Sequence, residues 1–472
     1  MRRLGCGLAV LSLSVLSACS STTYERTDDG TTSPPGSLAW SPCGGLQCAR
    51  VRVPIDYGAP ALGTIEIAIN RASTTASERR GVVLLNPGGP GAPGKSLVAD
   101  FAAVLRAELP GYDFIGFDPR GVGESASLRC SMDVDVVGLV KTSGVEVMLE
   151  ALRSASQRCA AENRLFNHLG SNQVVADIDR IREALGVEEI NFIGMSYGTR
   201  LGELYAQAFP EHARAVVLDA PVSPITDVTA EAKAQFDALL EAQMTFFADC
   251  ASGVLSCPAD PRGVFDSVVA TEPTEGDRSQ FLANWKLLLS SPPGREILAQ
   301  LLRAVASGQV MSSADMPVMA SVNALAFFNG FTNLTTNCAD SVVPPPSTSE
   351  AEALLASFRE RAPLFADQAI AAFTCAGWQV QPDPAPSLAF TPRILLLVIG
   401  GTADSLTPIE WARDTLADLP GSSLLLSEHY GHGAVLNGSQ CVFDFLRDYL
   451  DELTPVPEGA RCAAPTTPLM PP

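Results

Sequence analysis

The pentapeptide 194–198, Gly-Met-Ser-Tyr-Gly, places a serine between two glycines. The apolar run 190–193 precedes it and residues 201–208 repeat apolar side chains at helical spacing, so the sequence predicts a strand, a tight turn and a helix. Glycine suits both flanks of so sharp a turn because side chains there would collide. Ser196 at the apex is then a candidate nucleophile for acyl transfer, with the helix N-terminus directed at the same point. Taken alone, the pattern also fits an ordinary Gly/Ser turn.

A serine hydroxyl becomes an effective nucleophile when a histidine takes its proton and a third group orients that histidine. After a nucleophile on a strand-turn-helix elbow, the chain order is serine, acid, histidine. Two of the four histidines precede the candidate acid, which leaves His429 and His432. We favour His432 as the base because its flanking glycines leave it free to move on a loop. His429 fits the end of the preceding strand or the wall of a pocket.

The candidate acid is Asp404, which follows the apolar run 394–399. Residues 407–410 read as a capping box with proline at the first helical position, so a helix should begin just beyond Asp404. This places the carboxylate on a strand-to-helix loop at the carboxyl edge of a sheet. Asp219, at the end of an earlier apolar run, is the alternative acid.

A glycine-rich loop, Asn-Pro-Gly-Gly-Pro-Gly at residues 86–91, follows another short apolar run. Its two prolines have no N–H to donate, so the glycines are the free donors. We expect the N–H groups of Gly89 and Tyr197 to form an oxyanion hole for the charge that develops on an attacked carbonyl. The bland alternative is a Pro/Gly turn.

The patterning of the chain predicts the elements that would position these residues. Residues 50–53 and 64–71 alternate apolar and polar side chains, as antiparallel edge strands do, whereas 82–85 and 114–117 are wholly apolar, as buried parallel strands are. From 222 to 390 strand patterns vanish and helical segments alternate with Pro/Ser/Gly stretches. We therefore predict an α/β fold with a mostly parallel central sheet, helices on both faces and an inserted helical cap. The predicted divisions are core 41–221, cap 222–390, core 391–463 with the acid and the histidine, and a tail 464–472.

The first forty residues read as an export segment and a tether. Residues 1–18 have the basic start, apolar stretch and small residues of a secretory signal, and the apolar stretch is too short to span a bilayer. Ala18 before Cys19 resembles a bacterial lipobox, which predicts lipidation of Cys19 and a membrane anchor through that lipid alone; ordinary signal cleavage is the alternative. Residues 19–40 are rich in Ser, Thr, Gly and Pro and predict a disordered tether. The net charge of −20 argues against nucleic acid as a partner.

Ten cysteines remain beyond Cys19, an even number that suggests five disulfides in an exported chain. The simplest pairing joins neighbours along the chain: Cys43 with Cys48, Cys130 with Cys159, Cys250 with Cys257, Cys338 with Cys375, and Cys441 with Cys462. We expect no metal site, because the sequence has no Cys-x-x-Cys pair and no Cys/His cluster.

Together these motifs resemble one family. Residues 86–91, 118–125 and 194–198, with Asp404 and the Gly-His-Gly at 431–433, are similar to the exported α/β-hydrolases of the proline iminopeptidase and tripeptidyl aminopeptidase group. The likeness spans roughly residues 43–462 and includes the segments around the late cysteines. It implies a secreted or membrane-anchored serine aminopeptidase without a cofactor, which releases tripeptides or short N-terminal pieces through an acyl-enzyme on Ser196. The iminopeptidases usually have histidine where Asn86 stands, which puts this chain on the tripeptidyl side and leaves the number of residues removed per cut open.

An aminopeptidase acts on peptides with a free N-terminus and must hold a protonated amine, for which a carboxylate of the cap is the natural partner. Glu231, Asp237, Glu241 and Asp340 are candidates. We name Asp340, because the nearby Cys338 would fix its backbone. Two alternative functions stay open: a carboxylesterase or lipase with the same triad, and a surface-anchored binding protein with a relic site. The sequence does not address the oligomeric state.

Overall fold

The computed structural model describes residues 36, 38–130, 134–272, 274–309, 330–384, 386, 390–435, 437 and 439–464. The signal segment, Cys19, nearly all of the tether and nearly all of the tail lie outside the described residues. The predictions made for them therefore stay predictions.

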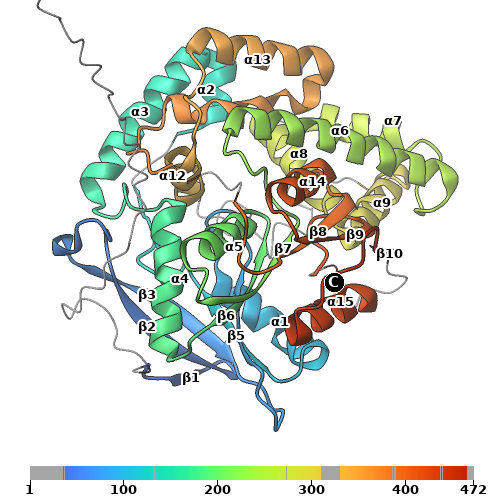
Figure 1. The fold of residues 1–472 in the computed structure, drawn as a ribbon. Coiled ribbons are helices and arrows are strands. Elements are labelled where there is room, and N and C mark those ends of the chain that lie inside the picture. The colour runs from blue at the N-terminus through green and yellow to red at the C-terminus, as the bar shows by residue number, and fades with distance from the viewer. Residues whose placement is uncertain are drawn as a thin grey trace, which may run out of the picture.

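The strands of the described residues form one twisted sheet in the order β1-β2-β3-β5-β4-β6-β7-β8-β9-β10 (Figure 1). The first three strands and the β3–β5 pair are antiparallel, and all other neighbours are parallel. This confirms the predicted α/β class with antiparallel strands at one edge. The strand bounds are β1 Ser41–Cys43, β2 Leu46–Pro54, β3 Thr64–Ala72, β4 Gly81–Asn86, β5 Tyr112–Phe117, β6 Ile190–Met195, β7 Ala213–Asp219, β8 Leu397–Ala403, β9 Ser423–Tyr430 and β10 Arg461–Cys462.

Helices cover both faces of the sheet, each over its own apolar cluster. One cluster takes Ile178 from α4, Leu201 from α5 and Ala412 from α14. The other takes Val98 from α1 and Phe443 from α15. Because both faces of the central strands are buried, those strands are mostly apolar, although Asp113 in β5 and Asn191 in β6 are buried polar residues. The helix bounds are α1 Gly94–Glu108, α2 Val136–Ser143, α3 Val145–Glu162, α4 Ser171–Leu185, α5 Tyr197–Ala208, α14 Ile409–Asp418 and α15 Gln440–Glu452.

Between β7 and β8 the described residues form helices and no strand, as the sequence predicts for a cap. These helices lie over one end of the sheet (Figure 1) and share a third apolar cluster around Phe246, Trp285 and Trp378. Helices α2 and α3, which precede the elbow, join the same cluster through Val140 and Leu152. The cap is therefore packed on a platform that the sequence did not assign to it. Its elements are α6 Val228–Ser252, α7 Pro261–Thr271, α8 Glu275–Leu289, α9 Pro292–Ala306, α12 Gly330–Asp340, α13 Thr348–Arg361, and the 3-10 helices η3 Pro363–Ala372 and η4 Thr374–Ala376.

All five disulfides form with the predicted nearest-neighbour pairing. Cys338–Cys375 joins α12 to η4 inside the cap. Five disulfides suit an oxidising compartment outside the cytosol. Within the described ranges, no helix combines the length and apolarity that a membrane crossing requires.

Candidate active site

Ser196 lies at the sharp turn between β6 and α5, with a left-handed φ of 55°. The turn is tight enough that a Cβ on Gly194 would clash with the carbonyl of Gly198. A Cβ on Gly198 would in turn lie 2.6 Å from the carbonyl oxygen of Asn86 at the end of β4. The two glycines are thus required by close backbone approach, and the strained serine is held where its side chain stands clear of the sheet.

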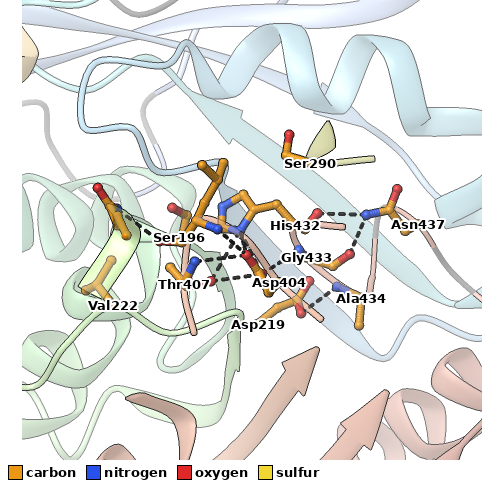
Figure 2. Close-up of polar contacts among 12 residues, drawn as sticks. Ser196, Asp219, Val222, Ser290, Asp404, Thr407, His432, Gly433, Ala434 and Asn437 are labelled. Atoms are coloured by element: carbon orange, nitrogen blue, oxygen red, sulfur yellow. Dashed lines mark hydrogen bonds and ion pairs between the residues drawn. The ribbon is translucent and has the colours of Figure 1, made fainter. Parts of the chain in front are cut away.

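The structure brings His432 to Asp404. The imidazole Nδ1 lies 2.8 Å from Asp404 Oδ2 and 3.1 Å from Oδ1. An ionised carboxylate only accepts hydrogen bonds, so Nδ1 carries the proton and the lone pair of Nε2 is left to accept one. Figure 2 draws Ser196 next to this imidazole.

Asp404 is fully buried and its oxygens are well supplied with donors. Oδ1 accepts the N–H groups of Leu406 and Thr407 at 2.8 and 2.9 Å, and Oδ2 accepts the Thr407 hydroxyl at 2.9 Å. Burial alone would raise the pKa of Asp404, but the charge and hydrogen bond of His432, together with these N–H groups, lower it below its usual value. The acid therefore stays ionised beside the histidine.

Thr407 has a different role from the predicted one. Helix α14 begins at Ile409, with Pro408 at its N-cap and no side-chain cap, so the expected capping box does not form. The Thr407 hydroxyl is committed to Asp404 instead, and it also lies 3.2 Å from His432 Nδ1. The Thr407 hydroxyl could either cap the helix or donate to the Asp404 carboxylate, and here it donates to the carboxylate.

His432 itself is poised by opposing effects on its pKa. Burial would lower the pKa of the imidazole, whereas the charge and hydrogen bond of Asp404, and then the charge of Asp219, raise it above its usual value. His429 is differently placed: its Nδ1 faces the Ser427 hydroxyl at 2.9 Å and its Nε2 faces the Gly433 carbonyl at 3.1 Å. Burial lowers the pKa of His429, so it stays neutral and supports the loop that carries His432.

The glycine loop after β4 lies directly against the elbow. A Cβ on Gly88 would lie 2.8 Å from the backbone nitrogen of Tyr197 and would also clash with Met195. The Gly88 N–H is used by the Asn86 side chain at 2.9 Å, whereas the Gly89 N–H has no partner among the described residues. Gly89 and Tyr197 line the same cavity as Ser196, which suits the predicted oxyanion hole.

This cavity has a volume of about 250 Å³ and lies between the elbow and the cap. Its polar wall includes Arg200, Glu231 and Asn333. Arg200 Nη2 donates to Glu231 Oε1 at 3.3 Å and to the Ser223 carbonyl at 3.0 Å. The structure thus brings a carboxylate of cap helix α6 to the cavity that contains Ser196.

Asp340 lies behind that wall instead of on it. It is fully buried, and its oxygens accept the N–H of Ser171 at 2.7 Å and the Ser171 hydroxyl at 2.5 Å. Burial raises the pKa of Asp340 to about 6. Of the candidate carboxylates for a substrate amine, the structure brings Glu231, and not Asp340, to the cavity.

The other sequence features lie elsewhere. Arg120 is buried and forms two hydrogen bonds with Asp177, at 2.6 and 2.8 Å, which gives it a structural role. His212 contacts Asp179 at 2.7 Å.

Comparison with known proteins matches two stretches of the chain to family models. Residues 81–255 match the α/β hydrolase fold, and residues 362–462 match the TAP-like proteins. The chain belongs to the TAP-like α/β hydrolases. The family match and the geometry around Ser196 agree that this hydrolase is of the serine type.

Three relatives of this chain are named for different hydrolase activities. The hydrolase is 28% identical to the serine protease Hip1 of Mycobacterium tuberculosis over 90% of this chain and 91% of that protein. It is 38% identical to the tripeptidyl aminopeptidase of Streptomyces lividans over 39% of this chain and 36% of that protein. It is also 28% identical to a carboxylesterase B of M. tuberculosis, over 88% and 86% of the two chains. Because two of these relatives are named as peptidases and one as an esterase, the substrate of this hydrolase must be argued from its own cavity.

Proposed function

We propose that this hydrolase is an aminopeptidase that removes short N-terminal pieces from peptides through an acyl-enzyme on Ser196. The observation that carries the proposal is the carboxylate of Glu231 on the wall of the cavity that Ser196 lines. An esterase for neutral acyl groups has no need of a carboxylate there.

In the proposed reaction each residue of the site has one role. His432 Nε2 takes the Ser196 proton as the hydroxyl attacks the scissile carbonyl, and the resulting oxyanion is held by the N–H groups of Gly89 and Tyr197. The C–N bond then breaks as the imidazolium gives its proton to the leaving amine. Water, activated by the same imidazole, releases the N-terminal piece and restores Ser196. Asp404 keeps the imidazole in the required tautomer throughout.

Glu231 is suited to a protonated amine. Arg200 contacts one of its oxygens, and the other has no partner among the described residues. Burial raises the pKa of Glu231 and the charge of Arg200 opposes this shift. A hydrogen bond from an ammonium group to this carboxylate would contribute about 1.5–3 kcal/mol to binding.

The size of the cavity favours a short N-terminal piece. Ligand pockets typically measure roughly 300–1,000 Å³, and this one, at about 250 Å³, lies just below that range. The cap encloses it with Asn333 and Asn337 from α12 and Thr374 from η4. A substrate would thus present its free end to the cavity and leave the rest of its chain outside.

The test compares tripeptidyl anilides with free and acetylated N-termini and short acyl esters, on the wild type and Glu231→Gln. We expect the substitution to raise KM for the free-amine substrates by about 10- to 100-fold, which corresponds to the lost charged hydrogen bond. Esters, which lack the amine, should be affected little. Glu241→Gln is the matched control, because Glu241 is an exposed residue of the same helix α6.

The outcome against the proposal is equally specific. If the wild type cleaves acetylated anilides as fast as free ones and short acyl esters faster still, the protein is an esterase and not an aminopeptidase. If instead the wild type prefers substrates with a free N-terminus, mass spectrometry of the products from a mixed peptide set gives the number of residues removed per cut.

A further inference from the structure

Asp219 is a second buried carboxylate beside the candidate base. It ends β7 and its side chain is fully buried. Oδ1 accepts the N–H of Ala434 at 2.8 Å and Oδ2 accepts the N–H of Val435 at 2.9 Å. These are the second and third residues after His432, so the carboxylate holds the loop that carries the base (Figure 2).

The backbone around Asp219 contacts the other two loops of the site. Its carbonyl accepts the N–H of Ser196 at 2.9 Å. The next residue, Ala220, has a left-handed φ of 55° and donates its N–H to the carbonyl of Ile399 at 2.8 Å, on the strand that leads to Asp404. Two consecutive residues therefore contact the elbow, the strand of the acid and the loop of the base.

Asp219 is separate from the acid that orients the imidazole. The hydrogen bonds from the His432 ring go to Asp404 and Thr407, and those to Asp219 come from backbone groups of the loop. Gly433 lies between them, and a Cβ on it would lie 3.4 Å from Asp219 Oδ2. This arrangement favours Asp404 over Asp219 as the acid that orients the imidazole, and it leaves Asp219 without a role in the usual three-residue scheme.

We propose that Asp219 is a positioning residue that fixes the His432 loop relative to Ser196 and adds a second negative charge facing the imidazolium. This inference rests on the proposed reaction at Ser196 and deepens it. Hydrogen bonds from the N–H groups of two successive residues give the loop one orientation, so that His432 Nε2 faces the Ser196 hydroxyl at the apex of the elbow. A reacting atom misplaced by about 1 Å can cost about 10²-fold in rate, which makes such a support functionally visible.

The electrostatic part of the proposal follows from the groups around His432. Asp404 and Asp219 carry the negative charges that act on its pKa, and the neighbouring His429 stays neutral. Burial raises the pKa of Asp219 to about 6, even though its two N–H bonds act in the opposite direction. A buried carboxylate kept at this cost next to the base is expected to favour the protonated imidazole that forms during the reaction.

The experiment measures, from pH 5 to 9, the rate at which a fluorophosphonate phosphonylates Ser196 and the rate at which a short acyl ester acylates it. Asp219→Asn keeps the shape but removes the charge, and its amide NH₂ must face one of the two N–H donors. We expect the plateau rate to fall by about 10- to 100-fold, with KM nearly unchanged. The acid limb should move to lower pH by up to about 1 unit, because removal of a negative charge lowers the pKa of His432.

Asp219→Glu separates the two effects and serves if the Asn variant does not fold. It keeps the charge and displaces the carboxylate by one methylene, so the rate should fall while the acid limb stays near its wild-type position. Asp177→Asn is the matched control: it also removes a buried aspartate, which pairs with Arg120 away from the site. We expect that control to lower the melting temperature and to leave the acid limb unchanged.

The inference is overturned if Asp219→Asn acylates at the wild-type rate with an unmoved acid limb, or if Asp219→Glu keeps the wild-type rate. Failure of the proposed function gives a different result. In that case the wild type itself either is not labelled at Ser196 or shows no preference for a free N-terminus.

Discussion

At the scale of single residues, His429 near the end of β9 and His432 just after it differ in what their ring nitrogens contact. His432 gives one nitrogen to Asp404 and keeps the other for a proton. Both nitrogens of His429 are used, by the Ser427 hydroxyl and by the Gly433 carbonyl. One ring can therefore act as a base, while the other supports the loop.

This difference predicts unequal effects of alanine at the two positions. His432→Ala should lower kcat by about 10⁴- to 10⁶-fold and abolish labelling of Ser196 by a fluorophosphonate, because it removes the base that takes the serine proton. His429→Ala should cost about tenfold, since the loop loses one hydrogen bond and keeps those to Asp219. Equal losses in the two variants would contradict the assignment, and Ser196→Ala gives the background for the labelling assay.

The sequence predicted Ser196, Asp404 and His432 because chain order and flanking glycines are local signals. It did not predict the use of Thr407, because a capping box and a carboxylate support require the same residue type at the same place. It also favoured Asp340 over Glu231 for the substrate amine. Which of these carboxylates reaches the cavity depends on how α6 and α12 pack, and that information is not local.

At the scale of elements, the cap contacts the catalytic loop directly. Ser290, between α8 and α9, accepts the backbone N–H of His432 at 2.7 Å. At the N-terminal end of α9, the Arg295 guanidinium stacks over the ring of Tyr430 at 4.2 Å. Gly431 lies between, where a Cβ would be 2.8 Å from the Ser290 carbonyl oxygen. A shift of the α8–α9 junction would therefore reach His432 without passing through the sheet.

Gly431→Ala tests this contact. The residue has a φ of 123°, which disfavours alanine, and the added methyl must push the Ser290 carbonyl away from the base. We expect a loss of about 10²-fold in kcat and about 1–3 kcal/mol in unfolding free energy. Gly144→Ala is the control, with a φ of 90° and nothing within 4 Å of its added methyl. It should lose stability but keep its activity; equal loss of activity in the two variants would contradict the contact.

Elements with a clear apolar period were predicted well. The buried parallel strands, the edge hairpin and the helical region after β7 all follow from patterns that extend over a few residues. The union of α2 and α3 with the cap was not predicted, because periodicity reveals an apolar face and not the cluster in which it is buried. Val140 and Leu152 show the same spacing whether they face the sheet or the cap.

At the scale of the whole molecule, this acidic chain also buries carboxyl groups that have few hydrogen-bond partners or opposite charges beside them. Glu203 on α5 is 1% exposed, and its Oε2 has no partner among the described residues. Burial raises the pKa of Glu203 to about 8, and the charge of Arg200 only partly opposes this. Its burial on α5 left no sequence signal, because a glutamate in a helix usually faces water.

These burial effects predict how stability depends on pH. The pKa of Glu203 is higher in the folded than in the unfolded chain, so its contribution is fully present below about 4.5 and is lost as pH rises through about 8. Asp219 and Asp340, with pKa values of about 6, act in the same direction and have lost their contribution before pH 7. Between pH 6.5 and 7.5 the unfolding free energy should therefore fall by about 1 kcal/mol through Glu203 alone. Urea unfolding at the two pH values measures this slope, and Glu203→Gln should remove it, whereas the exposed Glu189→Gln should not. If all three proteins have the same slope, Glu203 is ionised in the folded protein, and water or a rearranged Arg200 must compensate its charge.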